Sequence, residues 1–82
     1  MFNLHIFSIS FEEGNVNNII EIQANQEINV LKKNKFLLQS VVDKKSQEFH
    51  YRLASRSRDD IEKIRTEIEQ NQGVTNIEVT LN

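Results

Sequence analysis

Apolar and polar residues alternate at the start of the chain, which is the spacing of a β-strand. Between residues 3 and 11 the apolar side chains divide between two faces, with Leu4 and Ile6 on one and Phe7, Ile9 and Phe11 on the other. Two glutamates and Gly14 follow directly. The pattern predicts a first strand over residues 3–11 that enters a turn, because glycine tolerates turn conformations that other residues avoid.

A helical period replaces the alternation after Gly14. Six apolar residues recur at intervals that form one stripe on a helix, namely Val16, Ile19, Ile20, Ala24, Ile28 and Leu31. This spacing predicts a first helix over residues 15–33, with Asn15 as its N-cap and lysines gathered near its C-terminus. Where this helix ends stays open, because residues 28–31 are also compatible with the start of a strand.

The second half of the chain carries clearer signals. The pattern predicts a hairpin of two strands at residues 36–43 and 48–55, joined by a polar turn at residues 44–47. A second helix is predicted after Ser57, its buried stripe formed by Ile61, Ile64 and Ile68, with Gly73 as a left-handed C-cap. Alternation over residues 75–81 predicts the last strand.

The predicted order β-α-β-β-α-β is typical of one α+β architecture. Right-handed crossovers fold it into a four-stranded antiparallel sheet of order 4-1-3-2, with both helices on one face. We therefore expect a ferredoxin-like or ACT-like sandwich. The length of 82 residues allows one domain spanning residues 1–82 and excludes a second.

Composition narrows the classes of partner and site. The net charge of −2 does not favour a polyanion such as nucleic acid, and the lack of cysteine excludes disulfides and thiolate zinc sites. No apolar run approaches the length of a membrane span, so we expect a soluble, cytoplasmic chain. It is either a standalone protein or the excised tail of a membrane protein. No catalytic constellation can be assembled from the sequence, and we predict neither an enzyme nor a cofactor.

The face of the sheet that the helices leave uncovered is the first candidate site. The first predicted strand is apolar on both faces, and the second adds further apolar residues, which is more than an exposed sheet face normally carries. We therefore predict an interface for a second copy or for the rest of a parent protein. Its residues are His5, Phe7, Ile9, Leu37 and Val41.

Three other candidate sites have an ordinary structural role as their alternative. His5 and His50, with Glu48 nearby, suggest divalent-ion ligands but lack a fixed ligand spacing, and we predict no metal site. Phe49 and Tyr51 have the spacing of a base-stacking platform, but core packing explains them better in an acidic chain. The predicted first turn offers a small-anion or amino-acid site formed by Glu12, Gly14 and Asn15, although adjacent carboxylates oppose an anion.

Three segments of the second half, residues 49–53, 57–61 and 72–79, resemble the C-terminal domain of MgtC/SapB-family membrane proteins. The resemblance covers residues 48–81, and the first half follows it only in element order. It implies an ACT-like regulatory domain, the cytosolic tail of a small membrane protein that bacteria use in magnesium homeostasis and virulence. The alternative is an ACT-type sensor of amino acids or anions, although Glu12-Glu13-Gly14 lacks the proline usual in such sensors.

Overall fold

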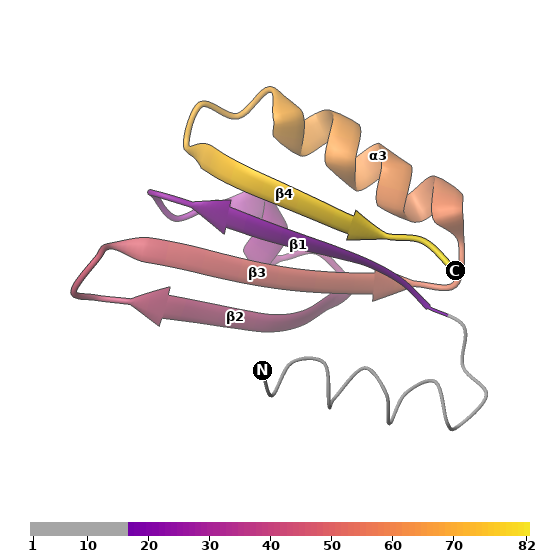
Figure 1. The fold of residues 1–82 in the computed structure, drawn as a ribbon, viewed down its shortest axis with the longest axis horizontal. Coiled ribbons are helices and arrows are strands. Elements are labelled where there is room, and N and C mark those ends of the chain that lie inside the picture. The colour runs from indigo at the N-terminus through magenta and orange to yellow at the C-terminus, as the bar shows by residue number, and fades with distance from the viewer. Residues whose placement is uncertain (1–16) are drawn as a thin grey trace.

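The structure is a computed structural model that describes residues 17–82 (Figure 1). Its elements follow in the order β1 (Asn18–Ala24), α2 (Asn29–Lys32), β2 (Leu37–Asp43), β3 (Glu48–Ser55), α3 (Arg58–Glu69) and β4 (Val74–Thr80). The strands form one antiparallel sheet in the order β2-β3-β1-β4. The predicted α+β class, with four antiparallel strands and two helices, is confirmed for these residues. The strand predicted at residues 3–11 lies outside them.

The first helix was predicted over residues 15–33, and this is wrong where β1 lies. Ile20, Ile22 and Ala24 alternate along β1 and are all buried, at 0%, 2% and 0% exposure. Ile22 falls outside the helical stripe, whereas a period of two places it on the core face. Branching at Cβ makes isoleucine well suited to a strand, and the sheet satisfies this preference. Within residues 17–33 the helical part is α2, which is four residues long and buries Leu31.

This correction changes which residues form the centre of the sheet. Counted from the β4 edge, the observed strand order is 4-1-3-2, the same numbers as predicted. The strand numbered 1 is β1 (Asn18–Ala24), however, whereas the prediction placed the segment at residues 3–11 in that position. β1 pairs with β3 on one side and β4 on the other.

The second half matches its prediction closely. β3 has the predicted bounds, and α3 and β4 begin and end within a few residues of theirs. In the turn between β2 and β3, the Asp43 carboxylate accepts hydrogen bonds from the backbone N–H groups of Lys45 and Ser46, and Gln47 adopts a φ of 57°. These contacts fix the hairpin that presents β3.

Two details at the ends of α3 differ from the prediction. Ser57 is the N-cap residue but makes no side-chain cap hydrogen bond; the Ser55 hydroxyl instead donates to Asp60 and accepts from the Ser57 N–H. The helix ends at Gln70 in a right-handed conformation, so Gly73 is not a left-handed cap. The Gly73 N–H donates to the Asn71 side chain instead, and so fixes the turn into β4.

The core is one cluster between the sheet and both helices. Helix α3 packs on β1, β3 and β4, and α2 packs against β2. The buried members are Ile20, Ile22, Ala24, Ile28, Leu31, Tyr51, Leu53, Ile61, Ile64 and Ile68. Because strand side chains alternate between faces, the opposite face of the sheet is left for other residues.

Candidate functional site

The sheet has one face on which neither described helix packs, and we call it the helix-free face. Its central side chains line an open hollow of about 360 Å³. They are Glu21 and Gln23 of β1, Gln39 and Val41 of β2, His50 and Arg52 of β3, and Asn76 and Glu78 of β4. The hollow therefore draws residues from all four strands.

Strand register arranges these side chains in two straight rows across the sheet. The first row consists of Gln39, Arg52, Glu21 and Glu78, each opposite its neighbour. Arg52 Nε lies 3.0 Å from Glu21 Oε2, with side-chain exposures of 9% and 33%. A guanidinium so deeply covered requires an anionic or hydrogen-bonding partner, and Glu21 supplies one.

Glu21 also has an acidic neighbour, because Glu78 is its direct partner on β4. Like charges directly opposite each other on a sheet are destabilising, and Arg52 offsets this by holding the Glu21 carboxylate on the β3 side. The row contains one cation and two carboxylates, so it carries one uncompensated negative charge among these side chains. Glu78 is exposed.

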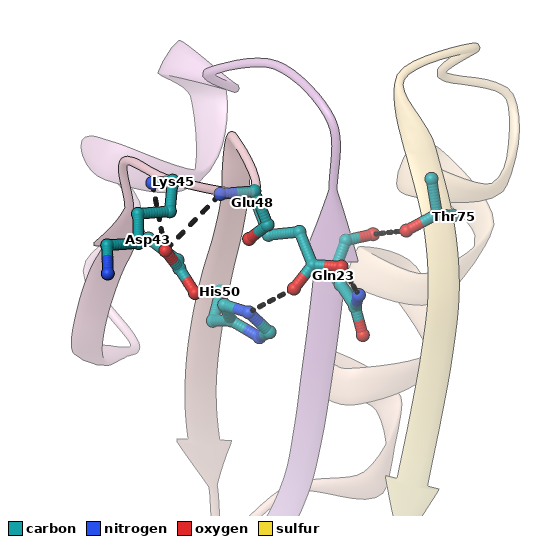
Figure 2. Close-up of polar contacts among 7 residues, drawn as sticks. Gln23, Asp43, Lys45, Glu48, His50 and Thr75 are labelled. Carbon is teal, nitrogen blue, oxygen red and sulfur yellow. Dashed lines mark hydrogen bonds and ion pairs between the residues drawn. The ribbon is translucent and has the colours of Figure 1, made fainter.

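The second row consists of Val41, His50, Gln23 and Asn76. Figure 2 shows the Glu48 carboxylate between the His50 imidazole and the Gln23 side-chain amide. Gln23 Nε2 donates to Glu48 Oε2 over 2.9 Å, and His50 Nε2 lies 3.4 Å from Glu48 Oε1. Thr75 Oγ1 donates to the Gln23 carbonyl oxygen. These contacts link β3, β1 and β4 and hold the polar side chains in defined positions.

Exposed apolar side chains gather on β2, which forms one edge of the sheet (Figure 1). Leu38, Val41 and Val42 are 64%, 44% and 46% exposed. The other exposed large hydrophobic residues of the described chain are Val30 and Leu81. The apolar surface is therefore concentrated along one strand, whereas the centre of the helix-free face is polar.

The predicted site residues have different outcomes. His5, Phe7 and Ile9 of the predicted interface, and Glu12, Gly14 and Asn15 of the predicted ligand site, lie outside the described residues. Val41 lies on the helix-free face as expected.

Leu37 is placed differently from the prediction. It pairs with Leu53 and packs partly buried against the core. The reason is a register shift between Leu37 and Gln39, which interrupts the alternation of faces along β2.

Sequence reasoning missed Glu21 and Gln23 as members of the site, because it placed them in a helix. The signal that identifies them is their alternation with Ile20, Ile22 and Ala24, which predicts a half-buried strand with its polar residues on one face. The division of β3 was predicted correctly: Tyr51 and Leu53 are buried in the core, and His50 and Arg52 lie on the opposite face. Core packing, rather than base stacking, explains Tyr51, which is 2% exposed.

Among residues 17–82, no group of three histidine, aspartate or glutamate side chains is arranged to hold a metal ion. Neither helix in this part of the chain is long and apolar enough to cross a membrane. Comparison of the chain with protein-family models, curated proteins and solved structures gives no match. The resemblance to the MgtC/SapB C-terminal domain therefore remains a prediction.

Proposed function

We propose that this chain is a non-catalytic regulatory or protein-interaction domain that contacts its partner through the helix-free face of the sheet. The observation that carries the proposal is the ordered polar surface on that face, with the Arg52–Glu21 ion pair at its centre. The ion pair holds the centre of the face in a fixed arrangement, and a surface that is already ordered loses little conformational entropy on binding. The exposed Glu78 carboxylate gives such an interface a preferred sign of charge.

The proposal extends to fold family and location. The order β-α-β-β-α-β within residues 17–82 is compatible with an ACT-like domain, and residues 48–81 carry the resemblance to the MgtC/SapB tail. On this basis the partner is the transmembrane part of a parent protein or a second copy, in the cytoplasm, in a process linked to magnesium homeostasis. Fold alone does not determine function, so the surface residues carry the test.

Site-specific photocrosslinking in the cells that naturally express the chain tests this proposal. A photoreactive phenylalanine derivative replaces Gln39 or Asn76 on the helix-free face, and Lys63 or Thr66 on the outer side of α3 serves as the matched control, all four being exposed. We expect discrete crosslinked bands only from the helix-free face, and a weaker band when Glu78→Lys reverses the charge. Equal labelling from both faces, or bands from α3 alone, contradicts the proposal.

One observation favours small-molecule sensing as a second candidate function. The hollow of about 360 Å³ falls in the range of small-ligand pockets and combines carboxylates with a guanidinium, the groups that recognise an amino acid. A thermal-shift series with amino acids and small anions tests it, because a ligand that binds only the folded state raises Tm. A ligand whose effect is lost in Asn76→Lys identifies this hollow as its site, and a flat series rules the candidate out.

A further inference from the structure

Strand β2 forms an edge of the sheet with little of the usual edge protection. Among residues 17–82 its one strand partner is β3, so its outer side has no strand to pair with in this part of the chain. Edge strands are normally protected by charges, by proline, by bulges or by being very short. The register shift of β2 lies at its start, between Leu37 and Gln39. From Gln39 to Asp43 the pairing with β3 is regular, without proline and with one charge, at Asp43.

The same edge carries exposed apolar side chains on both sides of the sheet. Val41 lines the helix-free face, and Val42 follows it directly in the strand. Successive side chains of a strand point to opposite faces, so Val42 lies on the other side. A strand beside β2 with apolar residues on both of its own faces would therefore cover exposed apolar side chains on each side of the sheet.

The chain itself contains a segment of this kind. Residues 3–11, which lie outside the described residues, alternate with Leu4 and Ile6 on one face and Phe7, Ile9 and Phe11 on the other. The segment contains no Asp, Glu, Lys or Arg. A separate molecule meets the β2 edge by diffusion, whereas this segment is tethered to β1, and a short flexible linker gives an effective concentration in the millimolar range.

The connection to β1 is long enough to reach the β2 edge, and it sets the direction of the strand. β1 and β2 begin at the same end of the sheet, because Ile20 and Leu37 both pair with Leu53 and both strands are antiparallel to β3. A strand on the outer side of β2 lies three strand spacings from β1, about 14 Å. The linker of residues 12–17 spans up to about 23 Å. Residues 3–11 would then run antiparallel to β2, which is the more stable pairing.

The opposite edge, β4, fits the segment less well. β4 is antiparallel to β1, so a segment that enters β1 through a short linker would run parallel to β4, and parallel pairs are slightly less stable. The exposed side chains of β4 are also polar or charged, namely Thr75, Asn76, Glu78 and Thr80. An apolar segment gains little from covering them.

We propose that residues 3–11 pair antiparallel with β2 as a fifth strand, so that the sheet order becomes residues 3–11, β2, β3, β1 and β4. The fifth strand closes the β2 edge to strands of other molecules. It also borders the hollow on the side of Val41, which it partly walls. The edge is a different surface from the centre of the helix-free face, and the inference holds whether or not the proposed function does.

Crosslinking within the full chain tests this arrangement, because the natural chain contains no cysteine and two can be introduced. One variant combines Ser8→Cys with Ser40→Cys on β2. The control combines Ser8→Cys with Asn76→Cys on β4, which is exposed like Ser40 but lies four strand spacings, about 19 Å, from the proposed strand. Each is treated with a short bifunctional maleimide, which bridges neighbouring strands whatever their exact register.

At low micromolar protein we expect a crosslinked monomer to form roughly tenfold faster in the Ser40 variant than in the Asn76 control, because the effective concentration of the two thiols falls steeply with their separation. Mass spectrometry and gel mobility distinguish a crosslinked monomer from a crosslinked dimer. Equal rates in the two variants, no crosslinked monomer from the Ser40 variant, or dimers as its main product each overturn the proposal.

Lysine variants of the Ser8→Cys, Ser40→Cys chain provide the second measurement. Val42→Lys places a charge on the proposed contact, and Thr66→Lys places one on the exposed side of α3, which packs on the other three strands. We expect Val42→Lys to slow crosslinking roughly threefold to fivefold, the effect of losing about one cross-strand contact, and Thr66→Lys to leave the rate unchanged. Circular dichroism confirms that both are folded. A folded Val42→Lys chain that crosslinks at the original rate overturns the proposal.

Discussion

Replacing Tyr51 by phenylalanine tests how the core is connected to the start of α2. The Tyr51 hydroxyl accepts a hydrogen bond from the backbone N–H of Ile28 over 3.0 Å, and both residues are buried, at 2% and 3% exposure. Ile28 is the N-cap residue of α2, and its extended backbone leads into a helix of only four residues. So short a helix has little stability of its own, and its position depends on such contacts.

The expected cost follows from the burial of the N–H group. Phenylalanine keeps the ring and its packing, so the variant removes the acceptor and leaves a buried donor without it. Such a donor costs about 1–3 kcal/mol, and we expect a loss of about 1.5 kcal/mol. For a domain of this size that corresponds to a fall in Tm of about 6–12 °C.

Urea unfolding followed by circular dichroism measures this cost, with the midpoint expected to fall by about 0.5–1.5 M at an unchanged m-value. Hydrogen exchange provides the local control: the amide of Ile28 is expected to lose protection more than amides in β4. A change in stability below about 0.3 kcal/mol, the error of such comparisons, refutes the reasoning. So does a loss of protection spread evenly over the domain.

Three further predictions concern the start of β1, the turn into β4 and the turn after β2. Asn18→Ala removes a buried amide that donates to two backbone carbonyls and accepts from the Asn82 N–H, so we expect urea unfolding to show a loss of about 2–4 kcal/mol. A methyl group at Gly73 meets the Gln26 side chain; Gly73→Ala should cost up to about 1 kcal/mol, and Gln26→Ala in the same chain should restore most of it. Hydrogen bonds from Ser46 lower the pKa of Asp43 below its ordinary 3.8, so an NMR titration of Asp43 should show a midpoint below 3.8. The contribution of Asp43 to stability is therefore present above pH 3.8 and is lost as the pH falls through the midpoint of the folded state.

The elements that could be predicted are those whose apolar residues fit either the strand period of two or the helical period of 3.6, but not both. Along β3, Phe49, Tyr51 and Leu53 alternate with the polar residues Glu48, His50 and Arg52 and have no helical interpretation. Along α3, Ile61, Ile64 and Ile68 fit only a helix. In both cases the burial found in the structure follows the pattern in the sequence.

β1 was mispredicted because its apolar residues satisfy both periods. Ile19, Ile20 and Ala24 fit a helical stripe, and Ile20, Ile22 and Ala24 fit a strand. The strand preference of isoleucine is weak compared with tertiary contacts, and the choice is made by the pairing of β1 with β3 and β4, which a single sequence does not show. Both polar rows of the helix-free face include a residue of β1, so the error in β1 also prevented the prediction of these rows.

Two glutamates in the first row respond in opposite directions to the same substitution. Glu21→Gln takes the carboxylate away from the largely covered Arg52 guanidinium, and we expect a loss of about 1–2 kcal/mol, less than for a fully buried pair because Glu21 is partly exposed. Glu78→Gln removes the like charge opposite Glu21 and should stabilise the domain by about 0.2–0.5 kcal/mol. Urea unfolding at low and high salt measures both, and the gain from Glu78→Gln should shrink with salt because that carboxylate is exposed. If both variants destabilise the domain by the same amount, Arg52 does not offset the repulsion between Glu21 and Glu78, and the reasoning is wrong.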